Sequence, residues 1–150
     1  MENTIISLVS AFFGALGFSL IFNIKKEHLF LASLGGIFTW AIYLTASGLF
    51  SADTLISSVF SGAFCQIYSQ ILARWKKTPA LIFCIPALVP LIPGGALYRT
   101  MRSVIHKDWS ETLNWGGTTL QVTFGIAIGM SFILGLLHIG NAIQKKKKKI

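Results

Sequence analysis

The most constraining feature of the sequence is a membrane-length apolar run that contains residues incompatible with a continuous helix. Residues 78–101 hold Pro86, Pro90 and Pro93, followed at once by Gly94–Gly95. Proline lacks an amide hydrogen and clashes with the carbonyl four residues before it, so we expect the helix to be interrupted here. In lipid, irregular backbone persists only where protein buries it or a polar cavity solvates it. Solute-handling membrane proteins place binding sites in such interruptions.

The rest of the chain is equally apolar. Of its 150 residues 53% are hydrophobic and only 12% are charged, against roughly 25% charged residues in a typical soluble domain. A bilayer core of about 30 Å requires about 20 apolar residues in a helix. The runs that meet this length are 3–22, 29–50, 54–73 and 116–138, with the broken run 80–98 as a fifth. We therefore expect an all-α, polytopic integral membrane helix bundle of about five spans, the fourth broken, in a single transmembrane domain over residues 1–150.

The formal charge of +8 is explained better by membrane orientation than by nucleic-acid binding. The basic residues lie between or after the apolar runs and lack the interleaved aromatics of a nucleic-acid-binding face. Lysine and arginine mark cytoplasmic loops, and here they follow the first, third and last runs. Five spans then place the N-terminus outside and the basic tail, residues 144–150, in the cytoplasm.

Three basic residues do not fit this charge rule. Arg99, Arg102 and Lys107 would lie near the outer side of the membrane, where the rule predicts few of them. We therefore expect these arginines to line a polar path or to pair with a partner subunit.

Charged residues are absent from the middle of every predicted span. Proton relays normally use intramembrane carboxylates, so a coupling group would come from another protein or from Asp53 or Glu111 near the span ends; the alternative is uncoupled passage. The polar residues Gln66 and Gln70 share one helical face at i, i+4 spacing. They either form interhelical hydrogen bonds or line a polar path.

Catalytic and metal-binding patterns are not found. The three histidines have no companion cysteine or carboxylate at ligand spacing, and the sequence contains no H-E-x-x-H, G-x-S-x-G or Walker motif. We expect no enzyme activity, no catalytic residues, no metal and no cofactor.

The broken run suggests a binding site. Pro93 suits the first turn of a second half-helix, whose free amides and dipole would attract a carboxylate. Arg99 and Arg102, at i, i+3, can share a face and offer forked donors. The alternative is a structural kink with arginines that extend toward the interface. The candidate substrate-binding residues are Pro86, Pro90, Pro93, Gly94, Gly95, Tyr98, Arg99 and Arg102, with Gln66 and Gln70 as weaker candidates for the opposite wall.

The string from Ile85 to Met101, IPALVPLIPGGALYRTM, resembles the signature of the threonine/serine exporter family. The chain looks like the short half of such an exporter, encoded as a separate polypeptide. The resemblance implies a multi-pass protein of the bacterial inner (cell) membrane and a larger membrane subunit of the same family as partner. It also implies threonine, serine or a dicarboxylate such as succinate as substrate, and proton-driven export with the coupling group on the larger half.

We therefore expect a membrane subunit of a two-component exporter of small carboxylate-bearing metabolites. Two alternatives remain at this point. Small size, few charges and the lysine tail also suit a pore-forming or holin-like protein, and the chain could be a purely structural accessory subunit.

Overall fold

The structure, a computed structural model, describes residues 2–49 and 53–147, with side chains described for residues 4–49 and 53–140. The described elements are all helical, as predicted. In chain order they are α1 (Glu2–Ile21), α2 (Lys26–Leu49), α3 (Thr54–Lys76), α4 (Leu81–Leu88), the 3-10 turn η1 (Val89–Leu91), α5 (Gly94–Ile105) and α6 (Trp109–Lys147).

The helix lengths confirm the prediction of about five spans with the fourth broken. α1, α2, α3 and α6 are each long and apolar enough to cross a membrane. Residues 81–91 and 94–105 meet at 51° and form a fifth candidate if the bent pair is one span. Phe50, the predicted end of the second span, and the last residues of the lysine tail lie outside the described residues.

Helix α3 is capped at both ends. Asp53 caps α3, because its carboxylate accepts from the amides of Leu55 at 3.0 Å and Ile56 at 3.4 Å. At the other end of α3, Lys77 adopts a left-handed conformation with φ 51° and donates its amide to the Ala73 carbonyl. Both ends of α3 are therefore fixed by hydrogen bonds of the residues that flank it.

Glycines set the closest helix contacts in the bundle. A Cβ on Gly62 would lie 2.8 Å from the Ile126 carbonyl oxygen, and one on Gly125 would lie 2.7 Å from the Leu55 carbonyl oxygen. α3 and α6 thus cross backbone to backbone, as small residues allow in membranes. At Gly35 the neighbour is a side chain: a Cβ there would lie 2.8 Å from the Ala87 Cβ of α4.

The interior is rich in small hydroxyl groups that bond within their own helix. Each buried serine in this set donates its hydroxyl hydrogen to the carbonyl four residues before it, at 2.7–2.8 Å: Ser19, Ser33, Ser57, Ser58, Ser61 and Ser69. Because such bonds satisfy the hydroxyl locally, they allow polar residues in a bundle with little bulky apolar packing.

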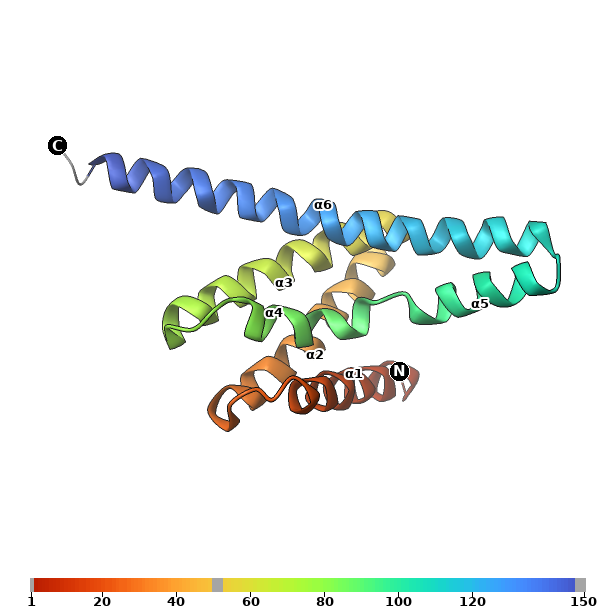
Figure 1. Ribbon diagram of the computed structural model, residues 1–150, viewed down its shortest axis with the longest axis horizontal. Coiled ribbons are helices and arrows are strands. Elements are labelled where there is room, and N and C mark those ends of the chain that lie inside the picture. The colour runs from red at the N-terminus through yellow and green to blue at the C-terminus, as the bar shows by residue number, and fades with distance from the viewer. Residues whose placement is uncertain (1, 50–52, 148–150) are drawn as a thin grey trace.

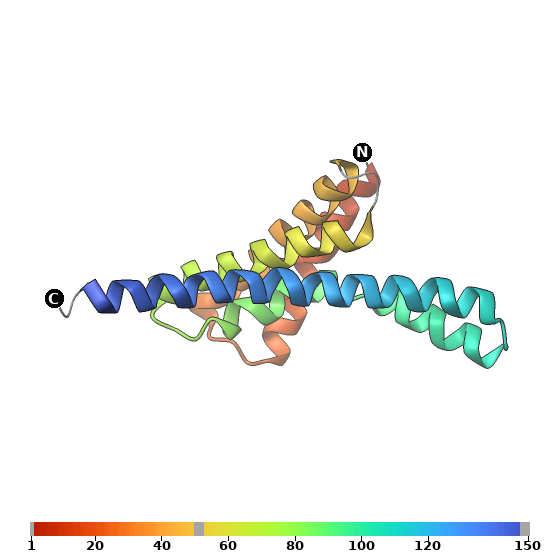
Figure 2. The same ribbon diagram turned by 90° about the horizontal axis from the view of Figure 1, so that it is seen from above.

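The arrangement of the helices leaves one part of the molecule outside the bundle (Figures 1 and 2). α5 and the N-terminal part of α6 run antiparallel and extend beyond α1 to α4 as an arm. The turns after α1 and α3 and the C-terminal end of α6 all lie on the side of the molecule opposite the arm (Figure 1). That grouping suits the charge rule, and the predicted orientation, N-terminus out and C-terminus in, stays a prediction.

Candidate functional site

The break between α4 and α5 keeps most of its own hydrogen bonds. Pro86 lies fully buried inside α4, and its carbonyl accepts from the Val89 amide. The Val89 carbonyl in turn accepts from Ile92 at 3.2 Å, so the chain passes through the prolines as a tightened 3-10 turn. The three prolines therefore free fewer backbone groups than their number suggests.

The second half-helix begins at Gly94, near Pro93 as predicted, but the proline lies at the N-cap position, one residue before the first turn in which we expected it. The Gly94 amide donates to the Ile92 carbonyl at 2.7 Å in a tight turn. In the described part of the chain, the amides of Gly95 and Ala96 have no backbone partner. A Cβ built on Gly94 or Gly95 meets nothing within 4 Å, so the chain faces open space on the Cβ side of these two glycines.

The arm contains a polar cleft of about 240 Å³, lined by Arg99 and Arg102 of α5 and by Glu111 and Trp115 of α6. The two arginines share a face, as their spacing predicted. The guanidinium carbon of Arg99 lies 4.3 Å from the centroid of the Trp115 ring, an arrangement that holds the cation in place by its attraction to the ring face.

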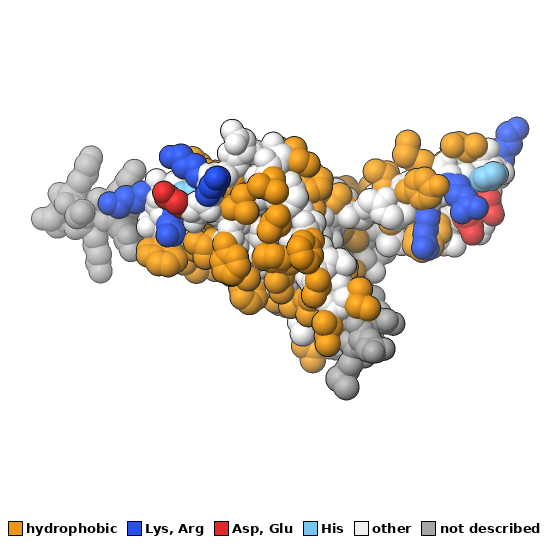
Figure 3. Space-filling view, turned by 90° about the horizontal axis from the view of Figure 1, so that it is seen from below, with side chains coloured by type: hydrophobic (Ala, Val, Ile, Leu, Met, Phe, Trp, Pro, Cys, Tyr) orange, Lys and Arg blue, Asp and Glu red, His pale blue; other side chains and the backbone are white. Residues whose placement is uncertain are grey.

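Charge is segregated on the molecular surface (Figure 3). Hydrophobic side chains cover the middle, whereas lysine and arginine gather at the two ends, one of which is the arm. Within the cleft, two arginines face one glutamate. The cleft can therefore accept an anion at the two arginines. It can also accept a cation beside Glu111 and Trp115.

Several predicted site residues lie outside this cleft. Tyr98 is 67% exposed and is not part of the lining. Pro90 lies in η1 against α1 and α2, because a Cβ on Gly36 would meet both Ala15 and Pro90. The broken segment thus divides into a buried part around Pro86 and Pro90 and an exposed part from Gly94 onward.

The two glutamines face different neighbours, and neither lines the cleft of Arg99 and Arg102. Gln66 is buried, with its side-chain oxygen 3.9 Å from the Cys84 sulfur of α4. Gln70 lies in a small groove with Arg74 and with Leu137 of α6. Gln66 therefore makes an interhelical contact, which was one of the two roles expected from its position.

Sequence reasoning did not assign Glu111 and Trp115 to the site. Their i, i+4 spacing places both on one face of α6, which was readable from the sequence. That this face meets the arginines depends on the antiparallel pairing of α5 and α6, for which the sequence gives no local signal.

The family comparison covers both the break and the cleft. The family described as "Threonine/Serine exporter, ThrE" matches residues 7–135, which is most of the chain. The chain belongs to the threonine/serine exporter family. No solved structure matches the chain.

Membership of the threonine/serine exporter family settles the class of protein. The chain is a multi-pass membrane transporter protein and not an enzyme. The residues matched include every candidate position named above, from Gln66 to Trp115.

Proposed function

We propose that this chain is the membrane subunit of a two-component exporter of small carboxylate-bearing metabolites and works with a larger subunit of the same family. The arm cleft carries this proposal, because it holds two arginines of the second half-helix, Arg99 in its middle and Arg102 in its last turn. Arginine offers planar paired donors to a carboxylate. The Gly95 and Ala96 amides lie outside the cleft lining, at the N-terminal end of α5, where the helix dipole also favours an anion.

The cleft favours an amino acid over a dicarboxylate. Glu111 lines it opposite Arg99 and Arg102. A second carboxylate on the substrate would meet this like charge, whereas an α-ammonium group would pair with it. Among the substrates that the family suggests, threonine or serine therefore suits the lining better than succinate.

The need for a partner rests on surfaces that this chain leaves open. The arm extends from the bundle (Figure 2) and exposes Leu97, Met101, Ile105 and Leu113 by half or more. Gly94 and Gly95 face open space. A glycine pair allows another molecule to approach the backbone closely. We propose that the larger subunit approaches it there, or the substrate that the larger subunit helps to enclose.

Export measured in cells tests the proposal. Cells that lack their own exporter would produce this chain with a larger family member, and efflux of labelled L-threonine and succinate would be followed. We expect Arg102→Gln to lower threonine efflux about 10- to 150-fold, the effect of losing a hydrogen bond to a charged group. Gly95→Leu should abolish efflux without loss of membrane insertion.

The matched control is Lys107→Asn, which removes a positive charge from the same arm outside the cleft lining. Lys107 has φ 58°, a conformation that asparagine tolerates. If efflux stays normal in Arg102→Gln and Gly95→Leu but is lost when this chain is omitted, the chain has an accessory role and does not bind the substrate. Absence of efflux from the wild-type pair would reject the export function.

A further inference from the structure

An apolar groove of about 260 Å³ lies along the first half of the broken span. It is lined by Phe18 and Phe22 of α1, by four apolar residues of the broken segment between Ile85 and Ile92, and by Ile126 of α6. Every described lining residue is hydrophobic, and none of them also lines the arm cleft. The groove is therefore a separate feature of the bundle, within its membrane-spanning part.

The groove exists because α4 buries only one of its faces. Phe83 packs on Ala32 of α2 and Leu72 of α3, whereas Ile85 and Ile92 are 40% and 59% exposed. α1 and α6 flank this exposed face on either side of α4 (Figure 1). Since these two helices make no extended contact with each other in the described part of the chain, the face stays open between them.

One end of the groove opens at a basic surface. Phe22 is followed directly by the turn after α1, in which Lys25 and Lys26 are exposed. The turn after α3 lies on the same side of the molecule, where lysine and arginine gather (Figures 1 and 3). The charged residues of the two turns are five bases and one acid: Lys25, Lys26, Arg74, Lys76, Lys77 and Glu27. The exposed Trp75 beside them is of the type that marks the level of lipid headgroups.

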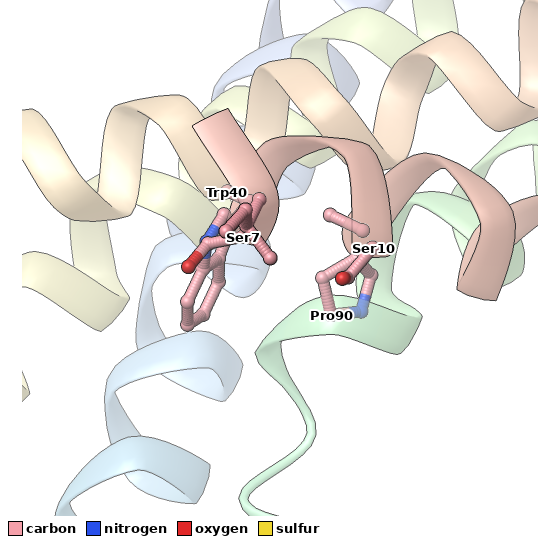
Figure 4. Close-up of a pocket in the computed structure, with 6 residues that line it drawn as sticks. Ser7, Ser10, Trp40 and Pro90 are labelled. Atoms are coloured by element: carbon pink, nitrogen blue, oxygen red, sulfur yellow. The ribbon is translucent and has the colours of Figure 1, made fainter. Parts of the chain in front are cut away.

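The other end of the groove is closed where η1 meets α1. A Cβ on Gly36 of α2 would lie 3.1 Å from the Ala11 carbonyl oxygen and 3.4 Å from the Pro90 ring. Figure 4 shows Pro90 next to Ser10 of α1, at a separate cavity beyond this contact. α1 rises about 16 Å between Ala11 and Phe22, which is about half of the 30 Å hydrocarbon core. The groove thus lies within one leaflet.

The size and the lining of the groove select a hydrocarbon chain. One turn of a helix, about 10 Å wide and 5.4 Å long, fills about 420 Å³, which is more than the groove contains. A charged or strongly polar solute finds no partner among the described lining residues and would lose its hydration there. An acyl chain meets both conditions, and a phosphate attached to it lies at the basic turns.

We propose that this groove binds an acyl chain of an anionic phospholipid whose phosphate lies at Lys25 and Lys26. Basic residues at a membrane surface attract anionic headgroups, and the apolar groove fixes the position of one such lipid. The bound chain contacts the segment from Ile85 to Ile92 and so stabilises the first half of the broken span in the position described above. The site goes beyond the proposed export function and does not depend on it.

Photocrosslinking of the intact chain tests the site without measuring transport. The chain would be reconstituted into phosphatidylcholine vesicles with a minor fraction of phosphatidylglycerol that carries a photoreactive diazirine in its acyl chain. Mass spectrometry would then locate the labelled residues. We expect the label to concentrate on the groove residues of α1 and α4. Ile85→Trp, which fills the groove, should remove most of this label, whereas Leu81→Trp, at an exposed position of the same helix outside the lining, should leave it unchanged.

The headgroup is tested by comparing phosphatidylglycerol with phosphatidylcholine that carries the same diazirine. Lys25→Gln and Lys26→Gln should each lower the preference for phosphatidylglycerol in the groove about 5-fold, the effect of one basic residue near the bilayer surface. Lys107→Asn, which removes a positive charge from the arm at the far side of the molecule, should leave the preference unchanged.

Three results would overturn the proposal. Label spread evenly over exposed positions such as Phe13 and Phe132 would mean that the lipid contacts are those of any membrane surface. Equal labelling of the groove by both lipids would reject the anionic headgroup. Loss of the groove label when the larger family member is reconstituted together with this chain would mean that a partner side chain occupies the groove.

Discussion

Replacing Gly129 by alanine tests whether α3 and α6 are held by backbone contact. A Cβ at Gly129 would overlap the Val59 carbonyl oxygen and would lie 2.9 Å from the Ala63 amide nitrogen. Ordinary contact begins at 3.4 Å, so α6 must move away from α3 by at least about 0.5 Å. Overpacking of this kind costs about 1–3 kcal/mol. Neither neighbour is a flexible side chain that could move aside.

The matched control is Gly135→Ala, because Gly135 lies in the same helix and its Cβ would meet nothing within 4 Å. Both changes carry the same intrinsic helix gain of up to about 1 kcal/mol, so their difference isolates the contact. We expect Gly129→Ala to be about 1–3 kcal/mol less stable than Gly135→Ala, measured by denaturant-induced unfolding in lipid bicelles. Equal stability of the two variants would refute the crossing described for α3 and α6.

Two further changes test single hydrogen bonds by the same unfolding assay. Tyr68→Phe should lower the free energy of unfolding by about 0.5–1.5 kcal/mol, because the Tyr68 hydroxyl donates to the Leu31 carbonyl of α2 at 2.6 Å. Tyr98→Phe, at an exposed position, should cost nothing measurable. Equal losses in the two variants would contradict the role assigned to the Tyr68 hydroxyl. Asp53→Ala should lower the free energy of unfolding by about 0.5–2 kcal/mol through loss of the α3 cap, while Asp53→Asn should retain most of the stability. If the asparagine variant is as unstable as the alanine variant, the cap does not act through its hydrogen bonds.

The fold was largely predictable because lipid leaves few choices. Long uncharged runs must be helices, and each of the four unbroken runs forms one helix over nearly all of its described residues. Pro93 also marked the start of the half-helix correctly. The hydrogen bonds within the break were less predictable, because Val89 and Ile92 restore them through 3-10 geometry that no residue pattern specifies.

The site was predictable in part, for a related reason. The spacing of Arg99 and Arg102 placed both on one helix face, and they do line one cleft. Their partners Glu111 and Trp115 belong to the next helix, and only the antiparallel pairing brings them close. The i, i+4 spacing of Gln66 and Gln70 predicts a shared helix face. Positions i and i+4 nevertheless differ by roughly 40° around the helix axis, and this difference directs the two side chains to different neighbours.

The back-bonded serines have a consequence for movement. Because each of these six hydroxyls bonds within its own helix, sliding one helix along another leaves none of the six unsatisfied. Between α3 and α4 the hydrogen bonds found among the described side chains are two thiol contacts, Cys65 to the Cys84 carbonyl at 3.7 Å and Cys84 to Gln66 at 3.9 Å. The first half of the broken span can therefore shift against its neighbour at little cost in hydrogen bonding, which is a mechanical property that an alternating-access transporter requires.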